Sequence, residues 1–163
     1  MPRPIGVLRF VNVFVAAIAA GTLTAMQVGL VPLVRSIPEG TGLAVRRAFE
    51  GRIDRYEPVC VALSAATAIC LLILGRGMTP RTRLLMAIGL AGSLAVGVTS
   101  LGWNNPIDHR MGPSAEAPLP PEYASLREKW EKGHLVRTAA GVAALGCYIV
   151  AGLLDRRARD NAS

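Results

Sequence analysis

The chain has 163 residues, 52% of them hydrophobic, and carries a formal net charge of +7 at pH 7. Its apolar residues are gathered in long runs with charged segments between them, a pattern that excludes one large soluble core and favours membrane-spanning helices. The arginines bracket these runs instead of forming a patch on a soluble domain, which excludes nucleic acid as a partner and indicates contact with the lipid bilayer.

The first apolar run has no charged residue between Arg9 and Arg35. A signal peptide is a competing interpretation because Arg3 and Arg9 precede the run, but the run is too long for a signal core and predicts a membrane span. Gln27 is its polar exception, and we expect it to face a partner helix or a ligand. Four spans are predicted in all, at residues 10–34, 58–74, 84–102 and 136–154.

The segments between the spans differ in character. Residues 35–57 are charged, with a short amphipathic helix expected over residues 43–56. Prolines and glycines predict an irregular segment over residues 103–120. A helix is predicted to begin near Pro121, to pass through Trp130 and to continue into the fourth span, so that the fourth helix extends beyond the membrane. The predicted loops on the side away from the termini are residues 35–57 and 103–135.

These elements predict one all-α domain over residues 1–163, a four-transmembrane-helix bundle with both termini on one side. Lys and Arg are densest on that side, in the N-terminal segment, the short turn at residues 75–83 and the C-terminal tail. Because short basic segments stay in the cytoplasm, we expect both termini to be cytoplasmic in a multi-pass protein of the cell membrane. Residues 103–137 are then expected at the extracytoplasmic face.

Five side chains recur at helical spacing as the chain approaches the fourth span. His134 can exchange a proton near neutral pH, and Arg137 at the lipid boundary can stabilise a developing oxyanion. Trp130 and Tyr123 can line a pocket or, equally, anchor the helix at the membrane interface. For Arg127 a solvated position is favoured. The stripe comprises Tyr123, Arg127, Trp130, His134 and Arg137.

A second polar group follows the third span directly. Asn104 and Pro106 are typical of a turn that ends a helix. In a functional interpretation, Asn104 contacts a substrate, and Asp108 orients His134 and holds its tautomer. His109 is expected at the surface. A metal site of His109, His134 and Asp108 would match no standard spacing, so no metal is predicted.

The two groups together resemble the anthrone oxygenase family of small membrane proteins. The resemblance rests on the four short spans, on the Asn-x-Pro-Ile pattern after the third span and on the Trp-x3-His-x2-Arg pattern entering the fourth. Asp108 stands where the family pattern usually has a second Asn. The matching residues are Asn104, Pro106, Ile107, Trp130, His134 and Arg137.

The resemblance implies oxidation of an activated methylene group in a polycyclic phenolic ketone to a quinone, with oxygen and without a tightly bound cofactor. His134 would remove the carbon-bound proton with help from Asp108. Arg137 and Asn104 would stabilise the phenolate, and the carbanion would react with oxygen directly. The predicted catalytic residues are therefore His134, Arg137 and Asp108, and the predicted contacts to a lipophilic aromatic substrate are Asn104, Trp130, Tyr123 and Gln27.

Two other functions remain as alternatives. A non-catalytic membrane subunit would bind another membrane protein through faces of small residues, and a homo-oligomer is an expectation of the same kind. A transporter is disfavoured, because Gln27 is the one polar candidate inside a span. The cysteines form no close pair, which disfavours a cysteine-based redox enzyme. The small-residue face of the first span comprises Ala17, Gly21, Ala25 and Gly29.

Overall fold

The computed structural model describes residues 3–75, 77–112 and 119–160, and within these ranges every element is helical. Two short π-helices, η1 and η2, interrupt the α-helical ladder. The elements are α1 (Arg3–Ala25), η1 (Met26–Leu30), α2 (Val31–Ser36), α3 (Glu39–Ile53), α4 (Glu57–Leu74), α5 (Pro80–Thr99), η2 (Ser100–Asn104), α6 (Asn105–Arg110) and α7 (Tyr123–Asp160).

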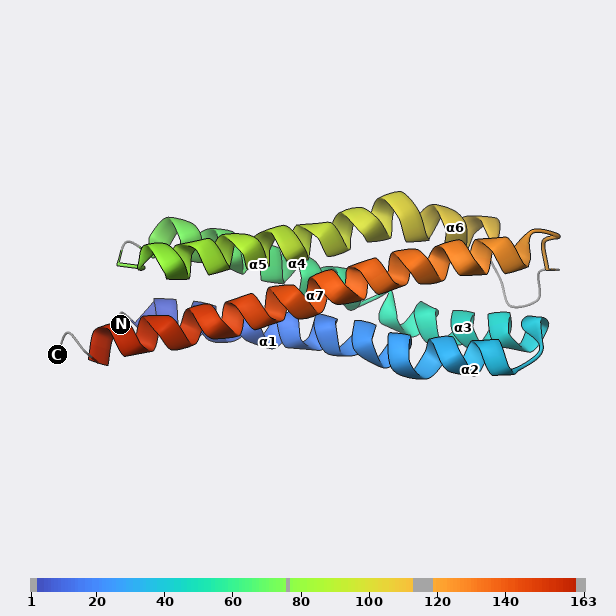
Figure 1. Cartoon of the computed structure of the whole chain (residues 1–163), viewed down its shortest axis with the longest axis horizontal. Coiled ribbons are helices and arrows are strands. Elements are labelled where there is room, and N and C mark those ends of the chain that lie inside the picture. The colour runs from blue at the N-terminus through green and yellow to red at the C-terminus, as the bar shows by residue number, and fades with distance from the viewer. Residues whose placement is uncertain (1–2, 76, 113–118, 161–163) are drawn as a thin grey trace.

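These elements form four long rods that lie side by side, with both termini at one end (Figure 1). Each rod is long and apolar enough to cross a membrane, which confirms the predicted all-α bundle with four spans. The protein is therefore a multi-pass membrane protein; the cytoplasmic placement of the termini stays a prediction. The candidate spans in the described residues are Pro4–Ser36, Glu57–Leu74, Pro80–Arg110 and Tyr123–Asp155.

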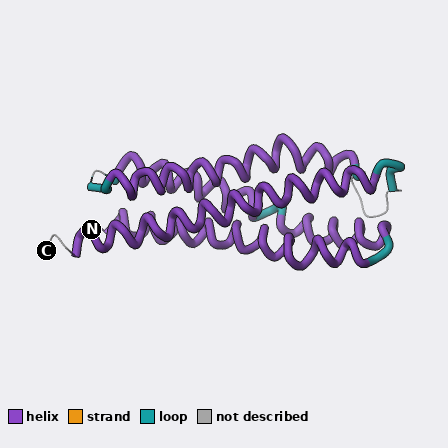
Figure 2. Tube along the Cα trace, in the orientation of Figure 1, coloured by secondary structure: helices purple, strands orange, loops and turns teal. Residues whose placement is uncertain are grey.

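The rods differ in length, and this difference divides the bundle into two halves. With 18 residues, α4 is about 27 Å long, close to the thickness of a bilayer's hydrocarbon core. With 38 residues, α7 is about 57 Å long and extends well beyond α4. We call the part of the bundle beyond α4, with α2, α3, α6 and the start of α7, the distal half. A short non-helical break between α3 and α4 lies about half-way along the bundle (Figure 2).

The prediction of an irregular segment directly after the third span was wrong for residues 103–110. The chain stays helical through η2 and α6 to Arg110. Pro106 is accommodated because the wide π-turn before it moves the carbonyls that a proline ring would strike in a regular α-helix. Pro32 follows η1 in the same way. Residues 113–118 of the predicted irregular segment lie outside the described ranges.

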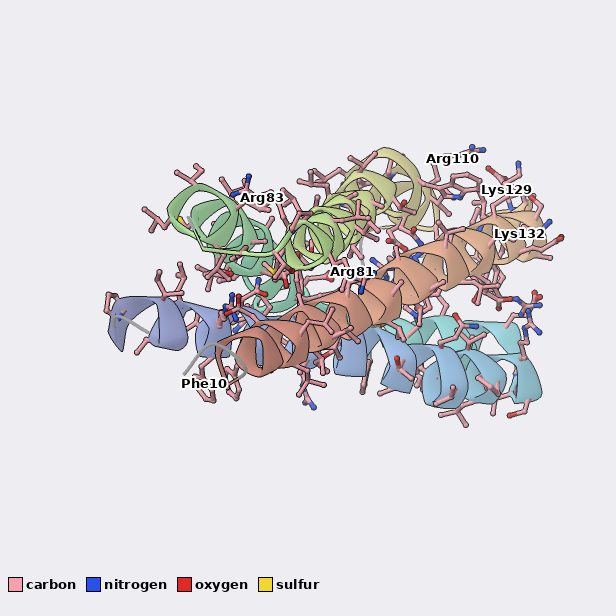
Figure 3. All side chains as sticks on the ribbon, turned by 60° about the vertical axis from the view of Figure 1, so that its left-hand side comes forward. Phe10, Arg81, Arg83, Arg110, Lys129 and Lys132 are labelled. Atoms are coloured by element: carbon pink, nitrogen blue, oxygen red, sulfur yellow. The ribbon has the colours of Figure 1, made fainter. Side chains whose placement is uncertain are left out.

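The other predicted elements agree more closely with the structure. One uninterrupted helix, α7, begins at Tyr123 and forms the fourth span, as predicted. The charged loop contains α3, which begins at Glu39 and ends at Ile53, slightly earlier than the predicted amphipathic helix. Basic residues lie toward both ends of the bundle. Arg110, Lys129 and Lys132 lie at the distal end (Figure 3), and Arg81 and Arg83 lie in the first turn of α5, at the other end.

Two apolar cores fill the bundle. One lies in the distal half and surrounds Tyr123 and Trp130. The other lies between the membrane-spanning parts and includes Tyr148, whose ring packs where a Cβ on Gly89 would stand. Small residues therefore allow α5 and α7 to approach closely, as is usual in lipid. Glycine at position 133 likewise makes room for the side chain of Asn104.

Candidate functional site

A cavity of about 600 Å³ lies between α4 and α5, where the chain breaks between α3 and α4. We call it the α4–α5 groove. Polar groups surround its distal end, and small or aliphatic side chains form its walls toward the membrane. It is lined by Glu50, Asp54, Glu57, Pro58, Val61, Ala62, Ala65, Ser93, Leu94, Val96, Gly97, Val98, Ser100, Leu101, Asn105, Asp108, His109 and Arg137.

Arg137 is the basic side chain that α7 contributes to this groove. Its residue is 8% exposed. The guanidinium Nε donates a hydrogen bond of 3.0 Å to His134 Nδ1, and Nη1 donates one of 3.3 Å to Ser100 Oγ. Among the described residues, no carboxylate lies within ion-pair distance of Arg137. A buried guanidinium without an anionic partner is costly, so the groove is suited to a ligand that carries negative charge.

His134 lies behind Arg137 and does not line the groove. It is fully buried, and its ring stacks on Trp130 with centroids 4.9 Å apart. Because Arg137 Nε is always a donor, His134 Nδ1 must accept, and the proton of the neutral ring lies on Nε2. Nε2 then donates to the carbonyl oxygen of Leu23, 3.2 Å away. Both ring nitrogens are engaged, which fixes the tautomer and holds Arg137 in place.

Asp108 was predicted to hold the tautomer of His134, but in the structure Arg137 and Leu23 make those contacts. Asp108 instead accepts a hydrogen bond of 3.1 Å from Trp130 Nε1 and forms an ion pair with Arg46. It also lines the groove. Asp108 and His134 are therefore connected through Trp130, which contacts both.

Arg46 of α3 is the second buried arginine of the site. Its guanidinium lies 4.5 Å from the centroid of the Trp130 ring, compared with 5.6 Å for Arg137. Unlike Arg137, it is paired with two carboxylates, those of Asp108 and Glu50. The Trp130 indole is thus enclosed by charged and aromatic neighbours at 2% exposure, and it does not line the groove.

Carboxylates dominate the distal end of the groove. Burial raises the pKa of Glu50 to about 7, and the charges of Asp108 and Asp54 add to this rise, while Arg46 and Arg137 oppose it. Burial likewise raises the pKa of Asp54. A carboxyl group with a pKa near neutrality, as that of Glu50, can give and take a proton at physiological pH.

Glu57, the first residue of α4, differs from the other carboxylates of the groove. It is 6% exposed, and it makes no hydrogen bond or ion pair with any residue that the structure describes. Its oxygens are therefore available to a ligand.

The other predicted substrate contacts lie outside the groove. Asn104 is fully buried and donates to the Trp130 carbonyl, while its Oδ1 has no partner in the described residues. Tyr123 is packed in the distal core, and Gln27 lies in η1. The structure therefore gathers Arg137 and Asp108 at the groove and places His134, Trp130 and Asn104 as a layer behind it.

His109 is exposed, as predicted, and it also lines the groove. In the described part of the chain, His, Cys, Asp and Glu side chains form no group of three or more that could hold a metal ion.

Sequence reasoning missed the residues that come from the segment before the second span. Glu50, Asp54 and Glu57 were read as loop charges, and Arg46 as one of several loop arginines. One signal was available: Glu57 opens a span just as Arg137 enters another. Charged residues at the ends of two spans are candidates for contact across a bundle.

The anthrone oxygenase family profile matches residues 46–147, more than half of the chain. The chain belongs to the anthrone oxygenase family. The matched range begins at the buried arginine of α3 and includes every residue that lines the groove. No curated protein and no solved structure matches the chain significantly.

Proposed function

We propose that the protein oxidises the activated methylene group of a lipophilic phenolic substrate to a carbonyl group, with molecular oxygen, in the α4–α5 groove. The observation that carries this proposal is Arg137, a buried guanidinium at the groove wall without a carboxylate within ion-pair distance in the described residues. Membership of the anthrone oxygenase family supports the same chemistry. An enolate or phenolate formed from the substrate would supply the missing negative charge.

The first step is removal of a proton from the methylene carbon. In our proposal Glu57 accepts this proton, because its carboxylate lines the groove and has free oxygens. The electron pair of the broken C–H bond moves into the ring system, and the resulting oxyanion rests against Arg137. Ser100 and His134 keep the guanidinium aimed at the groove.

The later steps balance without any further oxidant. The carbanion passes one electron to oxygen, and the two radicals join in a carbon–oxygen bond to give a hydroperoxide. Loss of the second proton from that carbon, with cleavage of the oxygen–oxygen bond, leaves a carbonyl group and one molecule of water. The methylene carbon loses four electrons, and the two oxygen atoms accept them.

This proposal gives His134 and Asp108 positioning roles. His134 as the base would require its Nδ1, the ring nitrogen that carries no proton, to leave Arg137. Asp108 holds Trp130 and Arg46, and Trp130 supports the His134 ring. The assignment of His134 as the base stays a prediction, which the pH–rate profiles of His134 variants can test.

The experiment uses the full chain in phosphatidylcholine nanodiscs with 1,8-dihydroxyanthrone and oxygen, and follows quinone formation by absorbance. We expect Arg137→Gln to lower kcat/KM by about 10²–10³-fold, the usual effect of removing an oxyanion donor. The matched control is Arg110→Gln, since Arg110 is 61% exposed and lies away from Arg137's contacts. Equal rates for wild type and Arg137→Gln, or no quinone above the rate without protein, would contradict the proposal.

A second candidate function is supported by one observation. The small residues of the first span lie on the outer surface of the bundle, and a Cβ at Gly21 or Gly29 would meet nothing within 4 Å. This face could hold a helix of another membrane protein or of a second copy. Gly21→Leu should then abolish association seen by crosslinking in membranes, while the matched change Gly102→Leu leaves it unchanged.

A further inference from the structure

The groove has a second polar group at its opposite end, deep between the spans. Ser93 lines the groove and is 5% exposed. Its hydroxyl lies 3.0 Å from the Tyr148 hydroxyl and 3.3 Å from Ser64 Oγ. A serine hydroxyl can make one donor and two acceptor contacts. One of the three hydrogen-bonding positions of the Ser93 hydroxyl is therefore unused, and the open space beside this residue is the groove.

The neighbours of Ser93 are held by contacts of their own. Asn12 donates from Nδ2 to the Ser64 carbonyl at 2.9 Å and to Thr67 Oγ1 at 3.0 Å. Helices α1, α4, α5 and α7 thus contribute to one buried network. A hydroxyl held by such a network offers its remaining hydrogen-bonding position to a ligand at a defined point in space.

Ser93 and Ser100 stand seven residues apart on α5, which is two helical turns and about 10 Å. Both line the groove. Between them lies Gly97, where a Cβ would meet nothing within 4 Å. The groove therefore offers two polar contacts separated by about 10 Å of apolar wall, with Arg137 and Ser100 at the distal end and Ser93 at the inner end.

The side of the groove is open to the outer surface of the bundle at the level of the spans. Leu94, Val98 and Leu101 line it and are 52%, 71% and 72% exposed. Because these side chains belong to a candidate span, their exposed surface faces the hydrocarbon of the membrane. A ligand can enter from the bilayer without crossing water.

We propose that the groove takes, from the bilayer, an elongated fused-ring molecule with an oxygen group at each end of its long axis. Arg137 and Ser100 bind the distal, ionised oxygen, and Ser93 forms a hydrogen bond with the inner one. The central ring then lies beside Gly97. The assignment of the distal oxygen rests on the proposed function, whereas the role of Ser93 as a specificity-determining residue can be tested by binding alone.

The test compares two probes by equilibrium binding to the full chain in phosphatidylcholine nanodiscs. The first, 2,6-dihydroxyanthraquinone, has a hydroxyl at each end, and 2-hydroxyanthraquinone lacks one of them. We expect Ser93→Ala to weaken binding of the first probe about 3- to 10-fold, the effect of one net hydrogen bond, and to leave the second unchanged. The matched control is Ser64→Ala, which removes a hydroxyl from the same network without changing the lining of the groove.

Three results would overturn the inference. They are an equal loss for both probes in Ser93→Ala, an equal loss of the first probe in Ser64→Ala, and no binding of either probe to wild type. Gly97→Leu gives an independent check, because it fills the middle of the groove where no packing stands in its way. It should abolish binding of both probes, and Gly102→Leu, on an exposed position outside the groove, should not. Normal probe binding without anthrone oxidation would refute the proposed function and leave this inference standing.

Discussion

Among the residues that the structure describes, two arginines are buried; both touch the Trp130 indole ring, and they have opposite surroundings. Arg46, 3% exposed, is paired with Asp108 and Glu50. Arg137, 8% exposed, is held by a neutral histidine and a serine. Arg46 forms two ion pairs within the protein, whereas no carboxylate of the described residues lies within ion-pair distance of Arg137, and the acids of the groove act on it only from farther away. Residue type and burial alone do not distinguish these roles; the neighbouring acids do.

The largest expected effect is on stability, at Arg46. Arg46→Gln leaves two partly buried carboxylates without their cation, so we expect a loss of about 3–5 kcal/mol in the free energy of unfolding. Arg137→Gln should cost far less, because no carboxylate of the described residues lies within ion-pair distance of this side chain. Thermal unfolding of the two variants in detergent measures the difference. Equal destabilisation would mean that Arg137 is also a structural cation, and the comparison would fail.

The second prediction concerns the base. Glu57→Gln keeps the size of the side chain and removes its ability to accept a proton, so kcat/KM for anthrone oxidation should fall by about 10³-fold with little change in thermal stability. Glu128→Gln, at an exposed position of α7, is the control. A rate within a factor of two of wild type would exclude Glu57 as the proton acceptor.

The third prediction separates positioning from proton transfer at His134. His134→Ala removes the acceptor for Arg137 Nε and should lower kcat/KM by about 10²-fold through misplacement of the guanidinium. The shape of the pH–rate profile should stay as in wild type, and His134→Gln, which offers an amide oxygen, should restore part of the rate. Disappearance of a titrating limb in both variants would instead make His134 the base.

The smallest effect is the pH dependence that Glu50 gives to stability. Its pKa in the folded protein is about 7, above the ordinary 4.5, so the folded state holds this proton more tightly than the unfolded chain does. The contribution to stability is complete below pH 4.5 and is lost as the pH rises through 7. After allowance for solvent screening we expect about 1–2 kcal/mol between pH 5 and pH 8, measured by thermal unfolding. Glu50→Gln should flatten this dependence, and an unchanged slope would contradict it.

The sequence predicted the spans well, because hydrocarbon imposes length and apolar character on each helix. It also predicted that His134 and Arg137 lie close together, since residues three apart on a helix are neighbours. Their contact in the structure follows that spacing directly. Helical spacing likewise placed Trp130 beside His134.

Contacts between segments far apart in the chain were not predictable in the same way. Asp108 and Arg46 are separated by 62 residues, and nothing in their local patterns indicates that they pair. The place of Glu57 at the groove depends on how α4 packs against α5 and α7, which no local pattern of the chain describes. The helical path through Pro106 was missed because a proline normally ends a helix, and the π-helix that permits it has no simple sequence pattern.

The π-helix η2 makes the number of residues in this segment matter as much as their identity. A π-turn holds about one residue more than an α-turn. The segment η2 is therefore equivalent to a helix with one residue inserted, which the wider turn accommodates. Deleting Gly102 would close the turn and place a carbonyl against the ring of Pro106, at a cost of about 3 kcal/mol. The same deletion combined with Pro106→Ala would leave a regular helix with Asp108 still in phase with Arg46. The chain should therefore tolerate the two changes together and not the deletion alone.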